Sequence, residues 1–276
     1  MRRMAVFLLL VTALSAAACG GAQAAPKPGV IWAVGDGADG SAGAKALAGR
    51  IRRDRPDRFL YLGDVYPAGT AEDFRDSYAT VYGPLARITS STPGNHEWGN
   101  RSEGYNAYWR ARTGRTPKPW YTFLLGGWRL FSLNSEAPHD AGSDQLSWLK
   151  RKLRGAQGSC RLAFWHRPRA SAGLHGDAVD IAPLWNALQG RARIVLSGHD
   201  HDSQRFRPSR GLVQYVAGAG GHGLYPVDRG DRRLRFADDT HYAALRIRLA
   251  PGIARLAFVS ADGQVLDRSR VRCSGG

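Results

Sequence analysis

The sequence predicts an α/β domain in which helices cover the faces of β-sheets. Short apolar runs that are typical of buried strands end in polar or glycine-rich turns, and helical patterns alternate with them. Pairs of strand-like runs also flank tight turns, which indicates added hairpins. The apolar runs are Val30–Gly35, Phe59–Gly63, Ile88–Pro93, Leu162–Trp165 and Ile194–Ser197.

Helical patterns occupy four segments between these runs. In one of them Leu146, Leu149 and Leu153 recur at helical spacing, and Ser143 is available as the N-cap. The segments are Ala42–Asp54, Ala71–Tyr82, Asp144–Leu153 and Ile181–Leu188.

Two hairpins and a further strand complete the predicted elements. Gly126-Gly127 separates Trp120–Leu125 from Trp128–Leu133, and Pro251-Gly252 separates Tyr242–Leu249 from Ile253–Val259. Such glycine-containing turns between strand-like runs are hairpin signals. A last strand is expected from Gln264 to Val271.

The N-terminal segment predicts a secretory signal at residues 1–24, followed by one domain at residues 25–276. Arg2 and Arg3 precede the apolar run Met4–Ala18, and Ala22-Gln23-Ala24 is a small-x-small cleavage site. The run is shorter than the ~20 residues that a membrane span needs, which favours export over an anchor. Cys19 leaves lipidation open, although the leucine usual three places earlier is missing. No later stretch predicts a transmembrane segment, so the product is expected to be secreted or at the cell-envelope exterior.

The net charge indicates which classes of partner to expect, and the cysteines indicate the cellular compartment. The chain carries a formal net charge of +16, mostly from scattered arginines, which fits either a solvated surface or attraction to anionic substrates and envelope surfaces. No nucleic-acid-binding motif is present, so no specific nucleic-acid partner is expected. Apart from Cys19, only Cys160 and Cys273 remain, which favours one disulfide over two buried thiols in an exported protein.

Polar side chains with metal-ligand chemistry follow five of the predicted strands. Carboxylate, amide and imidazole ligands together suit Mn, Fe or Zn better than Ca or Mg. Ligands of α/β proteins gather beyond the carboxyl ends of strands, where these residues lie. They occur in Gly35-Asp36-Gly37, Gly63-Asp64, Gly94-Asn95-His96-Glu97, Trp165-His166 and Gly198-His199-Asp200-His201.

This ordered set of motifs resembles the calcineurin-like metallophosphoesterase family and is most similar to its purple acid phosphatase-like branch. In that branch the first motif is a glycine-aspartate motif without the histidine that follows the aspartate elsewhere in the family, and Gly35-Asp36-Gly37 matches it. The resemblance runs from about Val30 to about Gln204. It implies a four-layer αββα sandwich of two mixed sheets flanked by helices, with two metal ions in a shared site.

The resemblance also implies which residues hold the two ions, whose identity among Fe, Mn and Zn stays open. Asp64 would bridge both ions, because a carboxylate can donate one oxygen to each. Asp36 and His201 would hold the first ion, and Asn95, His166 and His199 would hold the second. His199 and His201 are also two positions apart, so they would point the same way on extended backbone.

Two further histidines are expected to face the substrate. In the family, the histidine that corresponds to His96 is not a metal ligand. It faces the substrate, where it can protonate the leaving group or stabilise the transferring phosphoryl group. His175 follows His166 at a spacing similar to a substrate-facing histidine of plant purple acid phosphatases; the alternative is a loop residue in solvent. His222 is a weaker candidate for lining the cleft, and Glu97 either orients His96 or lies at the surface.

Tyr66 departs in spacing from the metal-binding tyrosine of the family. Purple acid phosphatases have an iron-binding tyrosine three residues after the bridging aspartate, whereas Tyr66 is two after Asp64. On extended backbone both side chains would point to the same side, and Tyr66 could bind the first ion. If the chain turns before Pro67, Tyr66 would only pack or hydrogen-bond nearby.

The resemblance implies direct hydrolysis of phosphorylated small molecules by a hydroxide held between the metals. The absence of a Gly-x-Ser-x-Gly elbow and of a P-loop agrees with this expectation. An exported phosphomonoesterase is the leading hypothesis. A phosphodiesterase of nucleotides or envelope phosphodiesters, and a surface protein that binds phosphate or polyanions without turnover, remain alternatives. The oligomeric state is not predicted.

Overall fold

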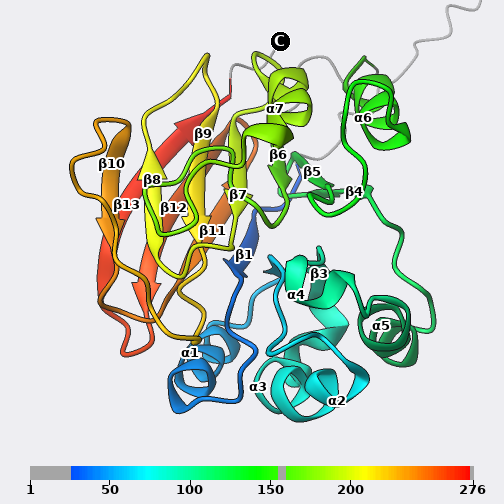
Figure 1. Ribbon diagram of the computed structural model, residues 1–276. Coiled ribbons are helices and arrows are strands. Elements are labelled where there is room, and N and C mark those ends of the chain that lie inside the picture. The colour runs from blue at the N-terminus through cyan, green and yellow to red at the C-terminus, as the bar shows by residue number, and fades with distance from the viewer. Residues whose placement is uncertain (1–25, 155–159, 274–276) are drawn as a thin grey trace, which may run out of the picture.

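The computed structural model describes residues 26–154 and 160–273, which form two packed β-sheets with helices on their outer faces (Figure 1). The predicted signal at residues 1–24 and the alternative lipidation site at Cys19 lie outside the described residues. Within the described part of the chain, no helix has the length and apolar character that a membrane crossing requires.

The first sheet has six strands in the order β13-β12-β11-β1-β2-β3. Its first three strands in sequence run parallel, and the last three form an antiparallel meander that joins them through β11 beside β1. The strands are β1 (Gly29–Val34), β2 (Arg58–Tyr61), β3 (Thr89–Ser91), β11 (Ala243–Ala250), β12 (Ile253–Ser260) and β13 (Val265–Arg272).

The second sheet has seven strands in the order β10-β8-β9-β7-β6-β5-β4. Four of them run parallel and β4, β8 and β10 are antiparallel to their neighbours, so this sheet is mixed as well. The strands are β4 (Tyr121–Leu125), β5 (Trp128–Ser132), β6 (Cys160–Phe164), β7 (Ile194–Ser197), β8 (Ser203–Phe206), β9 (Val213–Ala217) and β10 (Leu234–Asp238).

Helices bury the outer face of each sheet. Ser41 caps the first helix by accepting a hydrogen bond from the Ala44 amide, and Thr70 and Asp73 form a capping box at the second. A π-helical turn, Phe74–Tyr78, joins the second helix to the third. The first sheet is covered by α1 (Ala42–Arg53), α3 (Ala79–Val81) and α5 (Ala107–Thr113), and the second by α6 (Asp144–Arg154) and α7 (Ala182–Leu188). Two further short helices, α2 (Ala71–Asp73) and α4 (Asn95–Trp98), contribute no residue to these apolar clusters.

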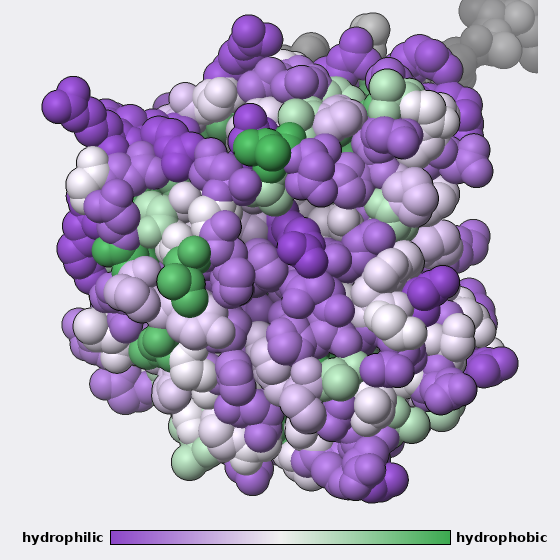
Figure 2. All heavy atoms as spheres, viewed as in Figure 1, coloured by the Kyte–Doolittle hydropathy of each residue, from purple (hydrophilic) through white to green (hydrophobic). Residues whose placement is uncertain are grey.

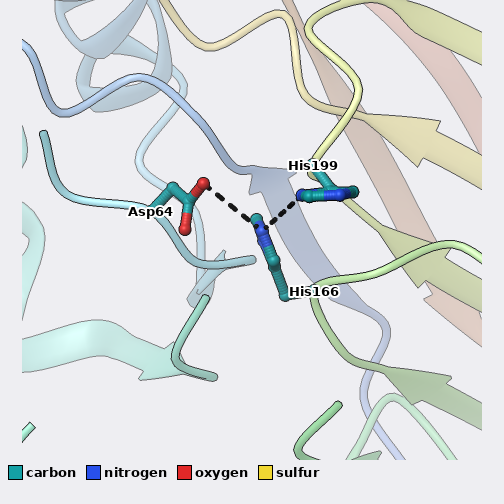
Figure 3. Close-up of side chains that lie close together, drawn as sticks. All are labelled: Asp64, His166 and His199. Atoms are coloured by element: carbon teal, nitrogen blue, oxygen red, sulfur yellow. Dashed lines mark hydrogen bonds and ion pairs between the residues drawn. The ribbon is translucent and has the colours of Figure 1, made fainter. Parts of the chain in front are cut away.

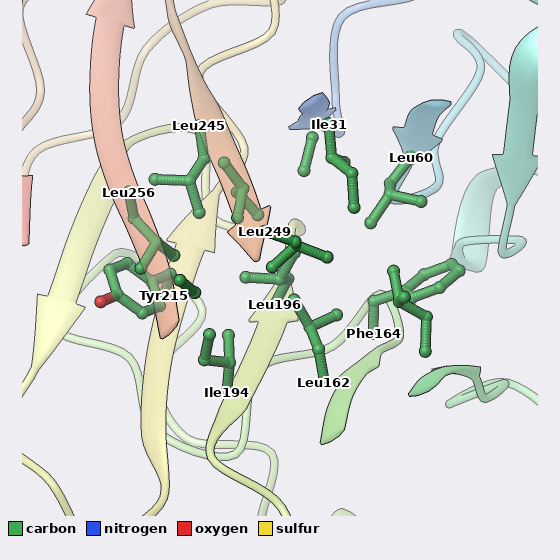
Figure 4. Packing of buried hydrophobic residues seen from close by; sticks show 14 of the residues in the cluster. Ile31, Leu60, Leu162, Phe164, Ile194, Leu196, Tyr215, Leu245, Leu249 and Leu256 are labelled. Carbon is green, nitrogen blue, oxygen red and sulfur yellow. The ribbon is translucent and has the colours of Figure 1, made fainter. Parts of the chain in front are cut away.

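The main hydrophobic core lies between the two sheets. Ile31 and Leu60 of the first sheet face Leu162 and Leu196 of the second, and all four are fully buried (Figure 4). Burial of each such side chain contributes about 1.5–3 kcal/mol. Two more clusters lie between the sheets and their helices. The layers are therefore helix, sheet, sheet and helix, which confirms the predicted four-layer α/β fold.

A disulfide joins the two sheets at one side of this core. Cys160 begins β6 in the second sheet, Cys273 follows β13 in the first, and their Cα atoms are 5.4 Å apart. Both sulfurs lie within the core cluster between the sheets. The predicted pairing is present in the structure.

The predicted hairpins are also present. Gly126 and Gly127 have φ angles of 59° and 79° between β4 and β5. Positive φ at both central residues is the requirement of a tight hairpin turn that matches strand twist, and glycine adopts it without strain.

Strands β8 and β10 and helices α4 and α5 were not predicted. Strand β8 has the sequence SQRF, which lacks a clear apolar alternation, although three of its four residues are buried. The amide of Gln204 on β8 donates to Asp202 and Ser171, so hydrogen bonds replace apolar packing there. Such burial of polar side chains is invisible to a hydrophobic pattern.

Candidate metal centre

The candidate ligands meet where the carboxyl ends of strands from both sheets lie close together. Asp36 follows β1, Asp64 follows β2 and Asn95 begins α4 just beyond β3. In the second sheet His166 follows β6, and His199 and His201 follow β7. The two sheets thus supply opposite sides of one buried polar cluster.

The backbone bends sharply at three of these residues. Asp36, Asp64 and His199 have φ angles of 59°, 66° and 74°. Left-handed backbone is unfavourable for residues with a Cβ atom and concentrates at functional sites. It also means that neither the segment after β2 nor the one after β7 is extended, so the expectation of extended backbone was wrong. The side chains converge because of these bends.

One group of ligand atoms gathers around Tyr66. Its hydroxyl lies 2.7 Å from Nε2 of His201 and 3.4 Å from both Asp36 Oδ1 and Asp64 Oδ2. Nε2 of His201 is 3.8 Å from Asp36 Oδ1. The Tyr66 side chain therefore points into the cluster, between two carboxylates and an imidazole.

A second group gathers around His166 (Figure 3). Its Nε2 atom lies 3.0 Å from Asn95 Oδ1, 3.1 Å from His199 Nδ1 and 3.4 Å from Asp64 Oδ2. Ligand atoms of Asp64, His166 and His199 all lie within 4.8 Å of one another. Asp64 Oδ2 belongs to both groups, so it is the atom that the two groups share.

The other polar atom of each of four ligands is held by a hydrogen bond. Nδ1 of His166 donates to the Leu62 carbonyl at 2.9 Å, and Nδ1 of His201 donates to the Gly223 carbonyl at 2.7 Å. Asp36 Oδ2 accepts from the His199 amide at 2.8 Å, and Asp64 Oδ1 accepts from the His96 amide at 3.1 Å. These bonds fix the rings and carboxylates with their remaining atoms directed inward, as for metal ligands.

The electrostatics of the cluster favour a cation. Burial raises the pKa of Asp36, whereas the charge of His166 outweighs burial at Asp64 and holds its pKa below its usual range. Burial lowers the pKa of His166, but the Asp64 carboxylate outweighs it and raises the pKa to about 10. Burial lowers the pKa of His199 to about 2 and that of His201 to about 4. A bound cation would compete with the proton on His166.

The donor set fits first-row transition metals. Carboxylate, phenol, amide and imidazole atoms converge, and no thiol takes part. Such mixed oxygen and imidazole shells suit Fe, Mn or Zn. Both groups of atoms contain at least one oxygen and one imidazole nitrogen, so each can contribute to holding an ion.

Glu97 is buried beneath the centre and is not a surface residue. Its Oε2 atom accepts hydrogen bonds from the amides of Asp64 and Val65 at 3.1 and 3.3 Å. Burial and the nearby Asp64 carboxylate raise the pKa of Glu97 to about 8. Glu97 therefore holds the left-handed turn at Asp64, and its Oε2 atom is bonded to backbone amides and not to His96.

His96 and His175 lie at the more exposed side of the cluster. Nδ1 of His96 donates to the Pro67 carbonyl at 2.5 Å, and its Nε2 atom is 3.8 Å from Asp64 Oδ2. The ring centroid of His175 is 4.2 Å from that of His199. The side chains of His96 and His175 are 36% and 38% exposed, so both rings can meet a molecule from solvent.

His222 reaches the same opening from the loop after β9. Its ring stacks on Tyr66 with centroids 3.9 Å apart, and its Nδ1 atom donates to Asp39 at 3.3 Å. The structure therefore brings all the predicted metal-binding and substrate-facing residues to one place.

Sequence reasoning missed Asp200 and Tyr225. Oδ1 of Asp200 accepts from both the amide and Nδ1 of His175, at 2.8 and 3.0 Å, while its Oδ2 accepts from Ser171. Tyr225 stacks on His201 with ring centroids 3.9 Å apart. Asp200 stands between His199 and His201, so its place in that motif was a usable signal. Tyr225 had no such signal.

The fold and this cluster together have the architecture of a metallophosphoesterase. The calcineurin-like phosphoesterase family model matches residues 29–203, so the chain belongs to that family. This result confirms the family and the enzyme class that the motifs predicted.

Two acid phosphatases and one solved structure are similar to the chain. It is 29% identical to mouse (Mus musculus) tartrate-resistant acid phosphatase type 5 over 147 residues, which cover 49% of this chain and 45% of the mouse protein. It is 24% identical to the human (Homo sapiens) counterpart over 83% of each chain. A purple acid phosphatase from yellow lupin (Lupinus luteus) seeds matches with a TM-score of 0.76 and 18% identity, over 90% of this chain and 54% of that one.

Two of these matches cover only part of the longer protein. The chain spans about half the length of the mouse relative and of the lupin structure. The lupin structure, at this identity, supports the fold. The purple acid phosphatase-like character predicted from the motifs agrees with the relatives.

Proposed function

We propose that the protein is an exported phosphatase that hydrolyses phosphate monoesters with two metal ions. The observation that carries the proposal is the position of Asp64 Oδ2, which both groups of inward-directed ligand atoms share. A shared carboxylate oxygen between two donor groups is the arrangement that a dinuclear centre needs. The membership of the phosphoesterase family supports the same reading.

Seven residues would hold the ions. Asp36, Tyr66 and His201 would bind the first ion, and Asn95, His166 and His199 the second, with Asp64 between them. When bound, two such ions supply Lewis acidity and an activated water for in-line displacement at phosphorus. Fe, Mn and Zn all suit the donors.

His96 would supply the proton to the leaving group, and His175 would contact the oxygens of the substrate. Nε2 of His96 is free of the hydrogen bond that holds Nδ1, and it lies at the exposed side of the centre. When the ring is an imidazolium, with a proton on each nitrogen, Nε2 can therefore give its proton to the departing oxygen of a monoester. His175 is held through Nδ1 by Asp200, which leaves its Nε2 atom for substrate oxygens. His222, stacked on Tyr66, lines the same opening for substrate.

Export and the choice of an anionic substrate rest on separate observations. The Cys160–Cys273 disulfide is typical of proteins outside the reducing cytosol, and the first 24 residues have the pattern of a secretory signal. The net charge of +16 favours association with phosphorylated molecules.

The test compares p-nitrophenyl phosphate with bis-p-nitrophenyl phosphate, using protein reconstituted with Fe, Mn or Zn. We expect turnover of the monoester. Hydrolysis of the diester alone would assign the protein as a phosphodiesterase instead. Turnover of neither substrate with any metal would favour a non-catalytic binding protein and would overturn the proposal.

Two variants locate that activity. Asp64→Asn should abolish turnover and reduce bound metal, because the neutral amide cannot bridge two cations. Asp76→Asn changes an exposed aspartate paired with Arg75, away from the candidate ligands, and should leave both unchanged. A fully active Asp64→Asn protein would refute the bridging role.

A further inference from the structure

The outward face of the three-stranded meander β11–β13 is covered with arginine. Leu245, Ile247 and Leu249 of β11 point into the core between the sheets, so the alternate residues point outward. The same alternation on β12 and β13 places more arginines on that face. The arginines of this outward face are Arg246, Arg248, Arg255, Arg268, Arg270 and Arg272.

The strand register aligns three of them in one row. Arg248 lies opposite Arg255, and Arg255 lies opposite Arg270 on the third strand. Like charges directly opposite each other on neighbouring strands destabilise a sheet. The protein keeps this repulsive row across the outward face of the meander, where all three side chains are exposed.

The next row leaves room between its charges. Ala257 lies opposite Arg246 on one side and Arg268 on the other. Because alanine is short, the arginines around it enclose a hollow of about 520 Å³. An anion placed over Ala257 would be surrounded by guanidinium groups on three strands. The hollow is lined by Arg246, Arg248, Arg255, Leu256, Ala257, Arg268, Ser269 and Arg270.

Few carboxylates neutralise these charges. Arg246 pairs with Asp54 at 2.7 Å. Among residues 26–154 and 160–273, no ion pair joins Arg248, Arg255, Arg268 or Arg270 to a carboxylate. Asp267 on β13 instead pairs with Arg205 at 2.7 Å. The face therefore has positive charge that is available to a ligand.

The chemistry of the face fits phosphate groups on a linear chain. Arginine binds phosphate oxygens in pairs through its planar guanidinium group, and the face uses arginine alone. A bilayer surface usually also requires apolar anchors. The large exposed hydrophobic side chains among the described residues, Leu124, Leu174 and Val179, are all outside β11–β13. On the face shown in Figure 2, hydrophobic side chains likewise occur in separate small groups.

This face is separate from the metal centre. Arg248 pairs with Val30 at the beginning of β1, whereas Asp36 follows the end of the same strand. Six residues of extended chain span about 20 Å. We propose that the outward arginine face of β11–β13 is a second anion-binding site, which binds a linear polyphosphate chain with one phosphate group over Ala257.

Binding of medium-chain inorganic polyphosphate by the whole protein, measured by isothermal titration calorimetry in EDTA, tests the site. The triple variant Arg248→Gln/Arg255→Gln/Arg270→Gln should weaken binding roughly tenfold or more and flatten its salt dependence, because fewer counterions are released. The matched control, Arg110→Gln/Arg115→Gln/Arg151→Gln, removes the same charge from exposed positions elsewhere and should change affinity less than about threefold. Equal losses in both triple variants would mean that only net charge matters, and would overturn the site.

A second variant keeps all the arginines and fills the hollow above residue 257. Ala257→Leu should weaken polyphosphate binding several-fold, with circular dichroism confirming the fold; unchanged affinity would refute the hollow as the binding position. Asp64→Asn should bind polyphosphate as the wild type does, and loss of binding there would place the anion at the metal centre. Binding to phosphatidylglycerol vesicles without binding to polyphosphate would identify a membrane surface as the partner and contradict the proposal.

Discussion

Tyr66 reaches the cluster by a route that the spacing of residues did not suggest. The left-handed backbone of Asp64 turns the chain, and Val65 then pairs with Ala38 as an isolated bridge between the two loops. The Tyr66 hydroxyl consequently lies between the Asp36 and Asp64 carboxylates. Burial raises the pKa of Tyr66, so ionisation of this phenol would require a cation beside it.

The visible spectrum of the iron-loaded protein tests this residue. If Tyr66 binds iron, a tyrosinate charge-transfer band should be present and should disappear in Tyr66→Phe. Tyr225→Phe is the matched control, because Tyr225 contacts the cluster by stacking its ring on that of His201. A band that persists in Tyr66→Phe would leave Tyr66 a packing residue.

Asp200 is expected to act through His175. Asp200→Asn should lower kcat for the monoester roughly tenfold to a hundredfold, since partners that orient site residues typically have effects of this size. The pH profile should change together with kcat, because the amide still accepts a hydrogen bond but no longer stabilises a charged imidazole. Asp180→Asn alters the exposed partner of His139 and should leave kcat unchanged. A purely structural role would reduce stability without altering the pH profile.

At the residue scale, the candidate ligands were predictable because they directly follow apolar strands in recognisable motifs. Glu97 was ambiguous, because sequence does not show that its side chain turns beneath Asp64. The place of Asp200 between His199 and His201 was a signal, but sequence does not show that its side chain turns to His175. Tyr225 depends on a loop path that no local pattern specifies.

At the element scale, strands with continuous apolar runs were predicted well, and strand β7 has the predicted bounds Ile194–Ser197. Strand β3 is shorter than the predicted run Ile88–Pro93, because only Thr89–Ser91 pairs with β2. The helix predicted at residues 71–82 contains a π-helical turn at Phe74–Tyr78. A 3.6-residue periodicity cannot reveal an inserted residue of this kind.

The end of α1 is joined to β1 and β11 by a charged group. Asp54 accepts hydrogen bonds from the Trp32 indole and the Arg246 guanidinium, both at 2.7 Å. Burial alone would raise the pKa of Asp54, but these bonds outweigh it and lower the pKa below its ordinary value. The lowered pKa means that the folded state favours the carboxylate.

Stability should therefore depend on the charge of Asp54. The contribution is fully present above the unfolded-state pKa of about 3.9 and is lost as the pH falls through the lower folded-state pKa. Asp54→Asn should unfold at lower urea concentration than wild type at pH 7, and the difference should shrink as the pH falls below about 4. A difference that does not depend on pH would assign the effect to packing.

At the scale of the whole molecule, the disulfide closes a long segment and ties the two sheets together. The cysteines are 113 residues apart in sequence. The chain-entropy account gives about 5 kcal/mol for a loop of this length, and removal of a native disulfide typically costs about 2–5 kcal/mol, so replacing both cysteines by serine should lower the free energy of unfolding by an amount in this range. Urea titrations of the double variant and of reduced wild type should agree. No loss of stability in either would remove the disulfide from the account of the fold.

The sequence anticipated the layers but not the placement of charge on them. The core between the sheets follows from apolar runs such as those of β1 and β6, whose members are buried on both faces. The arginine face depends on the register of β11, β12 and β13, which aligns residues that are only scattered basic positions in the linear chain. Register of this kind is set by tertiary packing.

Metal content measured together with turnover tests the central claim most directly. Elemental analysis of the purified, reconstituted protein should find about two first-row metal ions per chain. Hydrolysis of p-nitrophenyl phosphate should rise with that occupancy, and both should be lost together in Asp64→Asn. Full turnover by a metal-free protein, or stable binding of two ions with no turnover of any phosphate ester, would contradict the account.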